Sequence, residues 1–276
     1  MAGMLYLVPT PIGNLNDISP RCRQTLAEAD FIAAEDTRVS LKLLNHLELK
    51  KSLVSYHEHN KAESGEKILA RILGGETCAL VTDAGSPAIS DPGEDLVRLC
   101  AEHGVTVCAI PGPCALVTAL SISGLPTGRF TFEGFLSVNK KSRQEHLTGL
   151  KDETRTMIFY EAPHKLLSTL QDLAAAFGAE RKISLCRELT KLHEEVRRTT
   201  LGEAAAYYAE TPPRGEFVLV VAGAEAAAEE GCTFEDALAL VRTRMDEGLS
   251  TKDAVKQAAK LTGFAKNQLY DAILKG

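Results

Sequence analysis

The sequence predicts an α/β protein: two consecutive α/β domains and a small C-terminal helical unit of helix-turn-helix type. Three observations lead to this prediction. Short apolar segments alternate with amphipathic ones through the first hundred residues, a second such series runs to residue 223, and residues 233–276 carry helical patterns. Apolar strands separated by helices at this spacing indicate parallel α/β sheets.

The first domain is expected over residues 1–112. Ser19 is placed to cap its first helix, because Pro20 follows at the first helical position. Apolar runs predict strands at residues 4–8, 31–35, 52–56, 78–81 and 105–110. Amphipathic spacing and terminal glycines predict helices at residues 19–29, 38–47, 62–75 and 93–104.

The second domain is expected over residues 113–223, after a boundary near Pro111–Gly112–Pro113. Apolar runs predict its strands at residues 130–136, 156–162, 182–189 and 216–223. Longer amphipathic segments predict helices at residues 164–178 and 201–210. A helix is also expected to begin at Cys114.

An acidic linker is expected over residues 224–232. Residues 224–236 hold five acids and no base, which leaves the remaining chain near −1 out of a net charge of −6. This balance does not indicate a nucleic-acid-binding protein by charge alone.

The helical unit is expected over residues 233–276. Thr233 and Ser250 each have an Asp three residues later, a weak form of the capping box. Helices at residues 250–263 and 265–275 then flank a turn, which is helix-turn-helix spacing. A helical hairpin packed on the body of the protein would give the same pattern.

Composition narrows the class of protein. No apolar run approaches the roughly 18 residues of a membrane span. The first residues lack the basic and apolar regions of a secretory signal, so a cytoplasmic protein is expected. The seven cysteines include no Cys-x-x-Cys pair, which favours reduced, buried residues over a zinc site or a disulfide framework.

Two polar loops follow predicted strands, at residues 9–14 (PTPIGN) and 83–93 (DAGSPAISDPG). Ligands of open α/β sheets bind beyond the carboxyl ends of the strands. Neither loop matches a phosphate-binding motif, and Asp83 and Asp91 would repel phosphate. Carbonyl and carboxylate acceptors suit a ligand with hydroxyls and cationic groups, such as a sulfonium and an ammonium. An ordinary surface turn is the alternative.

Several segments, in this order, resemble one known family. They are LYLVPTPIGNLNDIS, AAEDTR, SYHEHN, LVTDAGSPAISDPG, IPGPCALVTAL, FYEAPHKL, CRELTKLHEE and GEFVLVV. The family is that of ribosomal RNA small subunit methyltransferase I, within the tetrapyrrole-methylase-like (class III) S-adenosylmethionine transferases. The resemblance covers nearly the whole chain. It implies S-adenosyl-L-methionine-dependent 2′-O-methylation of a cytidine in 16S ribosomal RNA near the decoding centre, by a homodimer with the cofactor between its α/β domains.

The resemblance also implies cofactor-binding residues. Gly85-Ser86-Pro87 replaces the Gly-Asp-Pro of the wider class and agrees with its RNA branch. Ordinary helix packing is the alternative for Leu116, which fits an apolar stripe with Leu120. The expected cofactor contacts are Ile12, Gly85, Ser86, Pro87, Ile89, Cys114, Ala115, Leu116, Tyr160, Glu161, Leu185, Cys186 and Arg187.

Methyl transfer from a sulfonium requires alignment of the acceptor oxygen and loss of its proton, without a metal. Candidate bases are Asp36, His57, Asp83 and Glu161, and helix caps are the alternative for the two Asp residues. The His-x-His of residues 57–59 suggests a metal site, but no third ligand is evident, so none is expected.

Basic residues near the second domain and on the C-terminal helices are candidates for phosphate contacts. A solvated helix start is the alternative for residues 139–146, and a strand edge is the alternative for residues 197–198. The candidates are Lys140, Lys141, Arg143, Arg197, Arg198, Lys252, Lys256, Lys260 and Lys266.

Two other functions remain open. One keeps the cofactor and changes the acceptor to a tetrapyrrole or a protein side chain. The other is a non-enzymatic ligand sensor coupled to the helix-turn-helix. Ser86 and the appended helical unit favour the RNA substrate.

Overall fold

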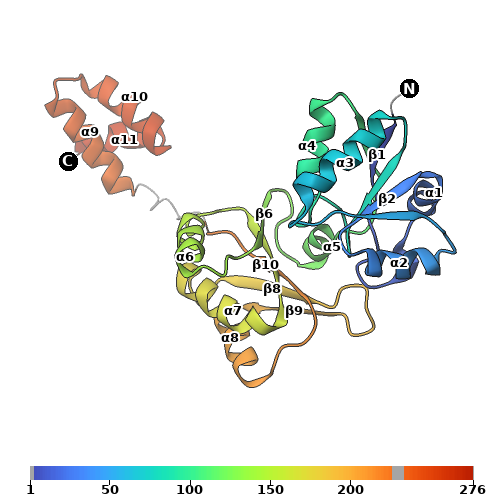
Figure 1. Ribbon diagram of the computed structural model, residues 1–276. Helices are drawn as coiled ribbons and strands as arrows, with labels where there is room; N and C mark the ends of the chain where they lie inside the picture. The colour runs from blue at the N-terminus through green and yellow to red at the C-terminus, as the bar shows by residue number, and fades with distance from the viewer. Residues whose placement is uncertain (1–2, 226–232, 276) are drawn as a thin grey trace. The chain divides into compact units, whose positions relative to one another are not determined.

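The computed structural model describes residues 3–225 and 233–275. The chain forms two compact units, Met1–Gly223 and Ala224–Gly276 (Figure 1). The first unit contains two five-stranded sheets and the second contains helices. This arrangement confirms the predicted fold class. Residues 226–232, which make up most of the expected acidic linker, lie outside the described residues.

The first sheet is entirely parallel, with the strand order β3-β2-β4-β1-β5. The central strands β2 and β4 are buried along their whole length, as expected of strands covered on both faces. The strands are β1 (Met4–Leu7), β2 (Phe31–Ala34), β3 (Ser52–Ser55), β4 (Cys78–Val81) and β5 (Thr106–Ala109).

Helices cover both faces of the first sheet. Ile68 and Leu96 of α3 and α4 pack with Phe31 on one face, and Leu26 and Leu44 of α1 and α2 belong to the cluster on the other face. The predicted cap of α1 is present, because the Ser19 hydroxyl accepts a hydrogen bond from the Cys22 amide. The helices are α1 (Pro20–Glu28), α2 (Thr37–His46), α3 (Lys61–Leu73) and α4 (Glu94–Glu102), with a short 3-10 turn at Leu15–Asp17.

The second sheet is mixed, with the order β6-β7-β10-β8-β9. Only β6 and β7 are parallel, while β10 runs antiparallel to both of its neighbours. Strand β9 was not among the predicted strands, because EVRRTT lacks the apolar pattern of a buried strand. It pairs with β8 at the edge of the sheet, so Arg197 and Arg198 lie on a strand edge, as the alternative interpretation of these residues held. The strands are β6 (Phe130–Phe135), β7 (Thr156–Glu161), β8 (Lys182–Arg187), β9 (Glu195–Thr200) and β10 (Phe217–Val221).

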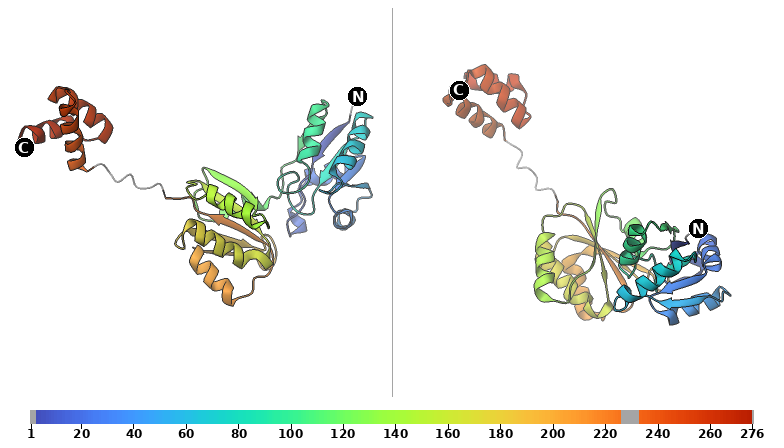
Figure 2. Two further views of the ribbon diagram at one scale, coloured as in Figure 1. Left: turned by 60° about the vertical axis from the view of Figure 1, so that its left-hand side comes forward. Right: turned by 45° about the horizontal axis from the view of Figure 1, so that its top comes forward.

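One face of the second sheet packs against α7 (Pro163–Phe177) and α8 (Leu201–Glu210), which lie side by side in Figure 2, and against α6 (Lys140–Gly149). The other face packs against α5 (Ala115–Ile122), whose Ala119 and Leu120 contact the cluster around Val218. Helix α5 is thus the first element after the first sheet, and it belongs to the core of the second.

The C-terminal unit is a bundle of three helices, α9 (Phe234–Asp246), α10 (Thr251–Thr262) and α11 (Lys266–Lys275). Thr233 and Asp236 form a full capping box for α9, and the Ser250 hydroxyl caps α10. Gly263 ends α10 in the left-handed conformation. The two predicted helices are present, and α9 adds a third. None of the helices in the described part of the chain is long and apolar enough to cross a membrane.

Candidate functional site

The main candidate site is a pocket of about 380 Å³ in the first unit. Its walls come from the loops after β1 and β4, the start of α5, the ends of β6, β7 and β8, and the start of β10. This volume lies in the range of small-molecule sites, which are mostly apolar with a few placed polar groups. The pocket therefore lies where the carboxyl ends of the first sheet's strands predicted a ligand.

A two-residue antiparallel bridge joins the two predicted loops beside the pocket. The Thr10 amide donates to the Gly85 carbonyl over 2.9 Å, and the Gly85 amide donates to the Thr10 carbonyl over 3.0 Å. Gly85 has φ +90°, and a Cβ there would lie 3.3 Å from Ile12 Cγ2. A left-handed backbone and a close neighbour both explain why this position holds glycine.

Two hydrogen bonds hold the wall of the pocket together. One joins the loop after β4 to the segment before α5, and the other joins α5 to β7. The Ser86 hydroxyl donates to the Pro113 carbonyl over 3.0 Å, and the Leu116 amide donates to the Tyr160 hydroxyl over 3.0 Å. Burial raises the pKa of Tyr160 to about 12, so its phenol stays neutral. The edge of the Tyr160 ring packs against Phe132 and Phe135. The pocket wall is therefore held by polar contacts between segments distant in sequence.

Most of the residues expected to contact the cofactor line this pocket. They are Ile12, Gly85, Ser86, Ile89, Cys114, Ala115, Tyr160, Glu161 and Cys186.

Pro87, Leu116, Leu185 and Arg187 do not belong to the pocket lining. Leu185 faces the cluster under α7 and α8, because side chains alternate along β8 and Cys186 takes the pocket face. Leu116 packs beside the cluster of Leu120. The Arg187 guanidinium pairs with Glu195 over 3.1 Å.

Of the four candidate bases, only Glu161 lines the pocket. It is 4% exposed; one carboxylate oxygen accepts from the Ala162 amide over 2.8 Å and the other from the Thr169 hydroxyl. Both of its oxygens are therefore already engaged at the start of α7.

Asp36, Asp83 and His57 lie outside the pocket lining. Asp36 caps α2, and hydrogen bonds from Arg38 lower its pKa to about 2, which makes it a weak base. Burial raises the pKa of Asp83, whose Oδ1 accepts from the Asp36 amide over 3.1 Å. The His57 amide donates to Asn60 in a turn before α3. In the described residues, no group of three His, Cys, Asp or Glu side chains is arranged to hold a metal ion.

Three charged residues that line the pocket were not proposed from the sequence as site residues: Asp91, Lys191 and Glu216. Burial raises the pKa of Asp91. Lys191 lies in the hairpin loop between β8 and β9, and Glu216 lies just before β10. Lys191 and Glu216 lie in the segments CRELTKLHEE and GEFVLVV, but they meet through the antiparallel pairing of β8 with β10, which no local sequence pattern records.

The three arginine candidates for RNA contacts each bind other groups of the protein itself. Arg143 pairs with Asp172 over 2.6 Å. Arg197 pairs with Glu195 and stacks on the Tyr207 ring at 3.8 Å.

Arg198 donates to the carbonyls of Ile122 and Ser123 at the end of α5. The lysine candidates are exposed, and among the described residues only Lys141 lies within 4 Å of an acidic side chain, that of Glu145 at 3.9 Å. The exposed candidates are Lys140, Lys141, Lys252, Lys256, Lys260 and Lys266.

The fold is that of a class of α/β methylases: a family model described as tetrapyrrole (corrin/porphyrin) methylases matches residues 4–205. A second model, described as the RsmI C-terminal HTH domain, matches residues 233–276. The chain belongs to the ribosomal RNA small subunit methyltransferase I family, as the resemblance in its motifs predicted.

Members with this name come from several bacteria. The Synechocystis protein is 48% identical over 273 residues, which cover 99% of this chain and 98% of that protein. The Pseudomonas aeruginosa protein is 45% identical over 276 residues, which cover 99% of this chain and 98% of that protein.

Solved structures share the fold at low sequence identity. Uroporphyrin-III-C-methyltransferase from Thermus thermophilus gives a TM-score of 0.55 at 21% identity, covering 79% of this chain and 94% of that one. Diphthine synthase gives a TM-score of 0.60 at 14% identity, covering 80% of this chain and 90% of that one. At these identities the likeness concerns the fold alone.

Proposed function

We propose that this chain transfers a methyl group from S-adenosyl-L-methionine to the 2′-oxygen of a cytidine in 16S ribosomal RNA, near the decoding centre. The observation that carries this proposal is the near full-length identity to ribosomal RNA small subunit methyltransferases I, which includes the C-terminal helical unit. The acceptor in the small subunit is inferred from the names of these relatives and from the resemblance.

The pocket is chemically suited to the methyl donor. A Thermus relative in fold was solved in complex with S-adenyl homocysteine. Here Asp91 and Glu161 supply negative charge, which suits a sulfonium and an ammonium, while Ile12, Ile89 and Cys186 supply apolar walls. The bound donor would supply an activated methyl group.

The protein's own contribution is alignment and exclusion of water. The Thr10–Gly85 bridge fixes the two loops on one side of the pocket, and the Leu116–Tyr160 hydrogen bond fixes the other. Rigid walls on both sides allow the acceptor oxygen to be held in line with the transferred methyl group. The donor is already charged, so this chemistry requires no metal.

We also propose a homodimer acting in the cytoplasm, with the small ribosomal subunit as its partner. The resemblance to the family supports the dimer, and a ribosomal substrate supports the compartment. Sedimentation of the purified protein at micromolar concentration tests the dimer. We expect a mass of about twice the 29.8 kDa of one chain.

Transfer of radiolabelled methyl groups tests the acceptor. Label from S-adenosyl-L-methionine should enter the RNA of small ribosomal subunits that lack the modification. Label in a porphyrin precursor or in a protein would instead assign a different acceptor. Binding of the donor without transfer to any acceptor would indicate a ligand sensor.

A further inference from the structure

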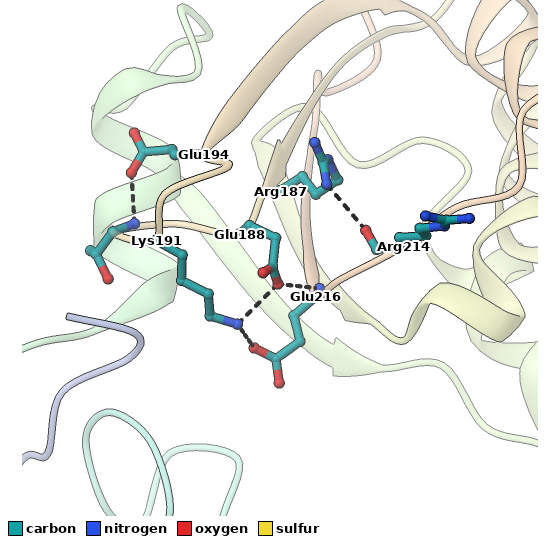
Figure 3. Close-up of polar contacts among 7 residues, drawn as sticks. Arg187, Glu188, Lys191, Glu194, Arg214 and Glu216 are labelled. Carbon is teal, nitrogen blue, oxygen red and sulfur yellow. Dashed lines mark hydrogen bonds and ion pairs between the residues drawn. The ribbon is translucent and has the colours of Figure 1, made fainter.

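An ion cluster of three residues forms part of the pocket wall (Figure 3). Lys191 Nζ lies 2.9 Å from Glu188 Oε1 and 2.8 Å from Glu216 Oε2. The Glu216 amide donates to the same Glu188 oxygen over 3.0 Å. This Lys191 cluster joins the loop after β8 to the residue that precedes β10.

Two glycines make room for the Lys191 cluster. A Cβ on Gly215, which has φ +83°, would lie 2.5 Å from Glu188 Cγ. A Cβ on Gly13 would lie 2.5 Å from Lys191 Cγ. Any larger residue at either position would displace the charged side chain beside it. The aliphatic part of Lys191 therefore lies against the loop after β1.

The loop that carries Lys191 adopts an uncommon backbone. Glu188 and Thr190 have φ of 52° and 65°, although neither is glycine. The Thr190 amide donates to Glu194 over 2.6 Å, which closes the turn (Figure 3). Left-handed non-glycine residues cost free energy and tend to gather at functional sites. Here they bring the Lys191 side chain to the pocket wall.

The charges of the Lys191 cluster define what it can do. Burial opposes the charged form of Lys191, but the hydrogen bonds that its ammonium donates to Glu216 and Glu188 outweigh this effect and raise its pKa. The hydrogen bond from Lys191 lowers the pKa of Glu188. Lys191 is therefore a fixed ammonium at neutral pH and cannot serve as a base.

The cluster still has groups to offer a ligand. An ammonium has three N–H donors, and Nζ uses two of them on carboxylates within the described chain. Glu216 Oε1 has no hydrogen-bond partner in that same part of the chain, and its side chain is 79% exposed. Lys191 is the only cationic side chain among the residues that line the pocket.

We propose that Lys191 and Glu216 act together on the acceptor hydroxyl, an inference that rests on the function proposed above. Lys191 donates a hydrogen bond to the acceptor oxygen, and Glu216 accepts the hydroxyl proton through its free oxygen. A new oxygen–methyl bond replaces the donor's sulfur–methyl bond, whose electron pair stays on sulfur. The proton then passes from Glu216 to water. Glu188 is a positioning residue that holds the ammonium.

Glu216 thereby acts as the general base, a role that none of the four candidates from the sequence fills. Asp36, Asp83 and His57 lie outside the pocket lining, and both oxygens of Glu161 are engaged. A cation beside an oxygen that becomes negative stabilises the transition state more than the ground state, so it acts on kcat.

The test compares Lys191→Met, Lys191→Arg and Glu216→Gln with Lys182→Met and Glu180→Gln. The two control residues are exposed and lie at the start of β8, at the other end of the strand from Lys191. Methyl transfer to small subunits gives kcat and KM, calorimetry gives the Kd of the methyl donor, and thermal melting reports folding.

Lys191→Met and Glu216→Gln should each lower kcat by about 100-fold. KM for small subunits and the Kd of the donor should stay within about threefold of the wild type. Lys191→Arg should recover part of the loss, because it restores the charge, and both control variants should match the wild type.

Wild-type kcat in either Lys191→Met or Glu216→Gln would overturn the proposal. A loss confined to KM with a weaker salt dependence would overturn it too, because it would mark a phosphate contact. A higher Kd of the methyl donor in Lys191→Met would also overturn the proposal, because Lys191 would then bind the donor and not the acceptor. If Lys191→Met does not fold, Glu216→Gln decides, since it leaves the Lys191–Glu188 pair intact. Absence of transfer by the wild-type protein would refute the proposed function instead.

Discussion

Thr10 and Gly85 exchange two backbone hydrogen bonds, of 2.9 and 3.0 Å, and so tie the loop after β1 to the loop after β4. The contact lies beside the pocket, and the Thr10 hydroxyl extends it by donating to the Thr82 carbonyl over 3.0 Å. Because Gly85 must keep φ +90° to make this bridge, the shape of the pocket depends on one glycine.

Gly85→Val should weaken binding of S-adenosyl-L-methionine by about tenfold or more, because a β-branched side chain is strained at positive φ and would crowd Ile12. Calorimetry measures the affinity. Gly104→Val is the matched control: Gly104 has φ +68°, has open space around it and lies outside the pocket lining. Both variants should lose some stability, but only Gly85→Val should lose affinity. Equal affinities would place the loop away from the donor.

The methyl donor and its demethylated product should raise the melting temperature of the protein. A ligand held between two sheets is lost on unfolding, so a concentration of 100 times Kd adds about 2.7 kcal/mol to the free energy of unfolding. Differential scanning fluorimetry with ATP and NAD as controls measures the effect. A larger shift with ATP than with either methyl-donor ligand would contradict the assigned cofactor.

Asp36→Ala should lower the melting temperature at pH 7 by about 2 °C, because the carboxylate caps α2. Asp36→Asn is the control, since Asn caps helices about as well. The pKa of Asp36 is lowered from 3.8 to about 2 in the folded protein. Its contribution to stability is therefore present above pH 3.8 and lost as the pH falls toward 2. Melting curves from pH 2 to 7 should show the gap between wild type and Asp36→Ala narrow across that window.

Removal of residues 233–276 should leave donor affinity intact, because the pocket belongs entirely to the first compact unit. Methylation of small subunits should fall, and its dependence on salt should weaken, if the exposed lysines of α10 and α11 contact phosphates. A full-length variant with Gln at positions 252, 256, 260 and 266 is the control that keeps the helices. An unchanged rate and salt slope in both proteins would assign the C-terminal unit a structural role only.

The sequence predicted the first sheet well because its signals are local. Apolar runs such as CALV mark strands that are buried on both faces, and Ser19-Pro20 marks a helix start. Strand β9 was missed because its burial is partial and its arginines serve other contacts: Arg197 stacks on Tyr207, and Arg198 caps the end of α5. Such pairings depend on tertiary structure, which no local pattern records.

The candidate site was predicted only where its signals lie within one local segment. Gly85, Ser86 and Ile89 lie in one loop whose composition already indicated a ligand. Lys191 and Glu216 are 25 residues apart and meet because β8 and β10 are antiparallel neighbours in the second sheet.

The position of the transferred methyl group tests the central claim most directly. RNA from labelled small subunits can be hydrolysed with alkali, which requires a free 2′-hydroxyl, so a 2′-O-methylated cytidine survives in a resistant dinucleotide. We expect the label to lie in such a dinucleotide, as 2′-O-methylcytidine, and heat-inactivated protein to give none. Label in a mononucleotide with a methylated base, or label absent from the RNA, would contradict this claim.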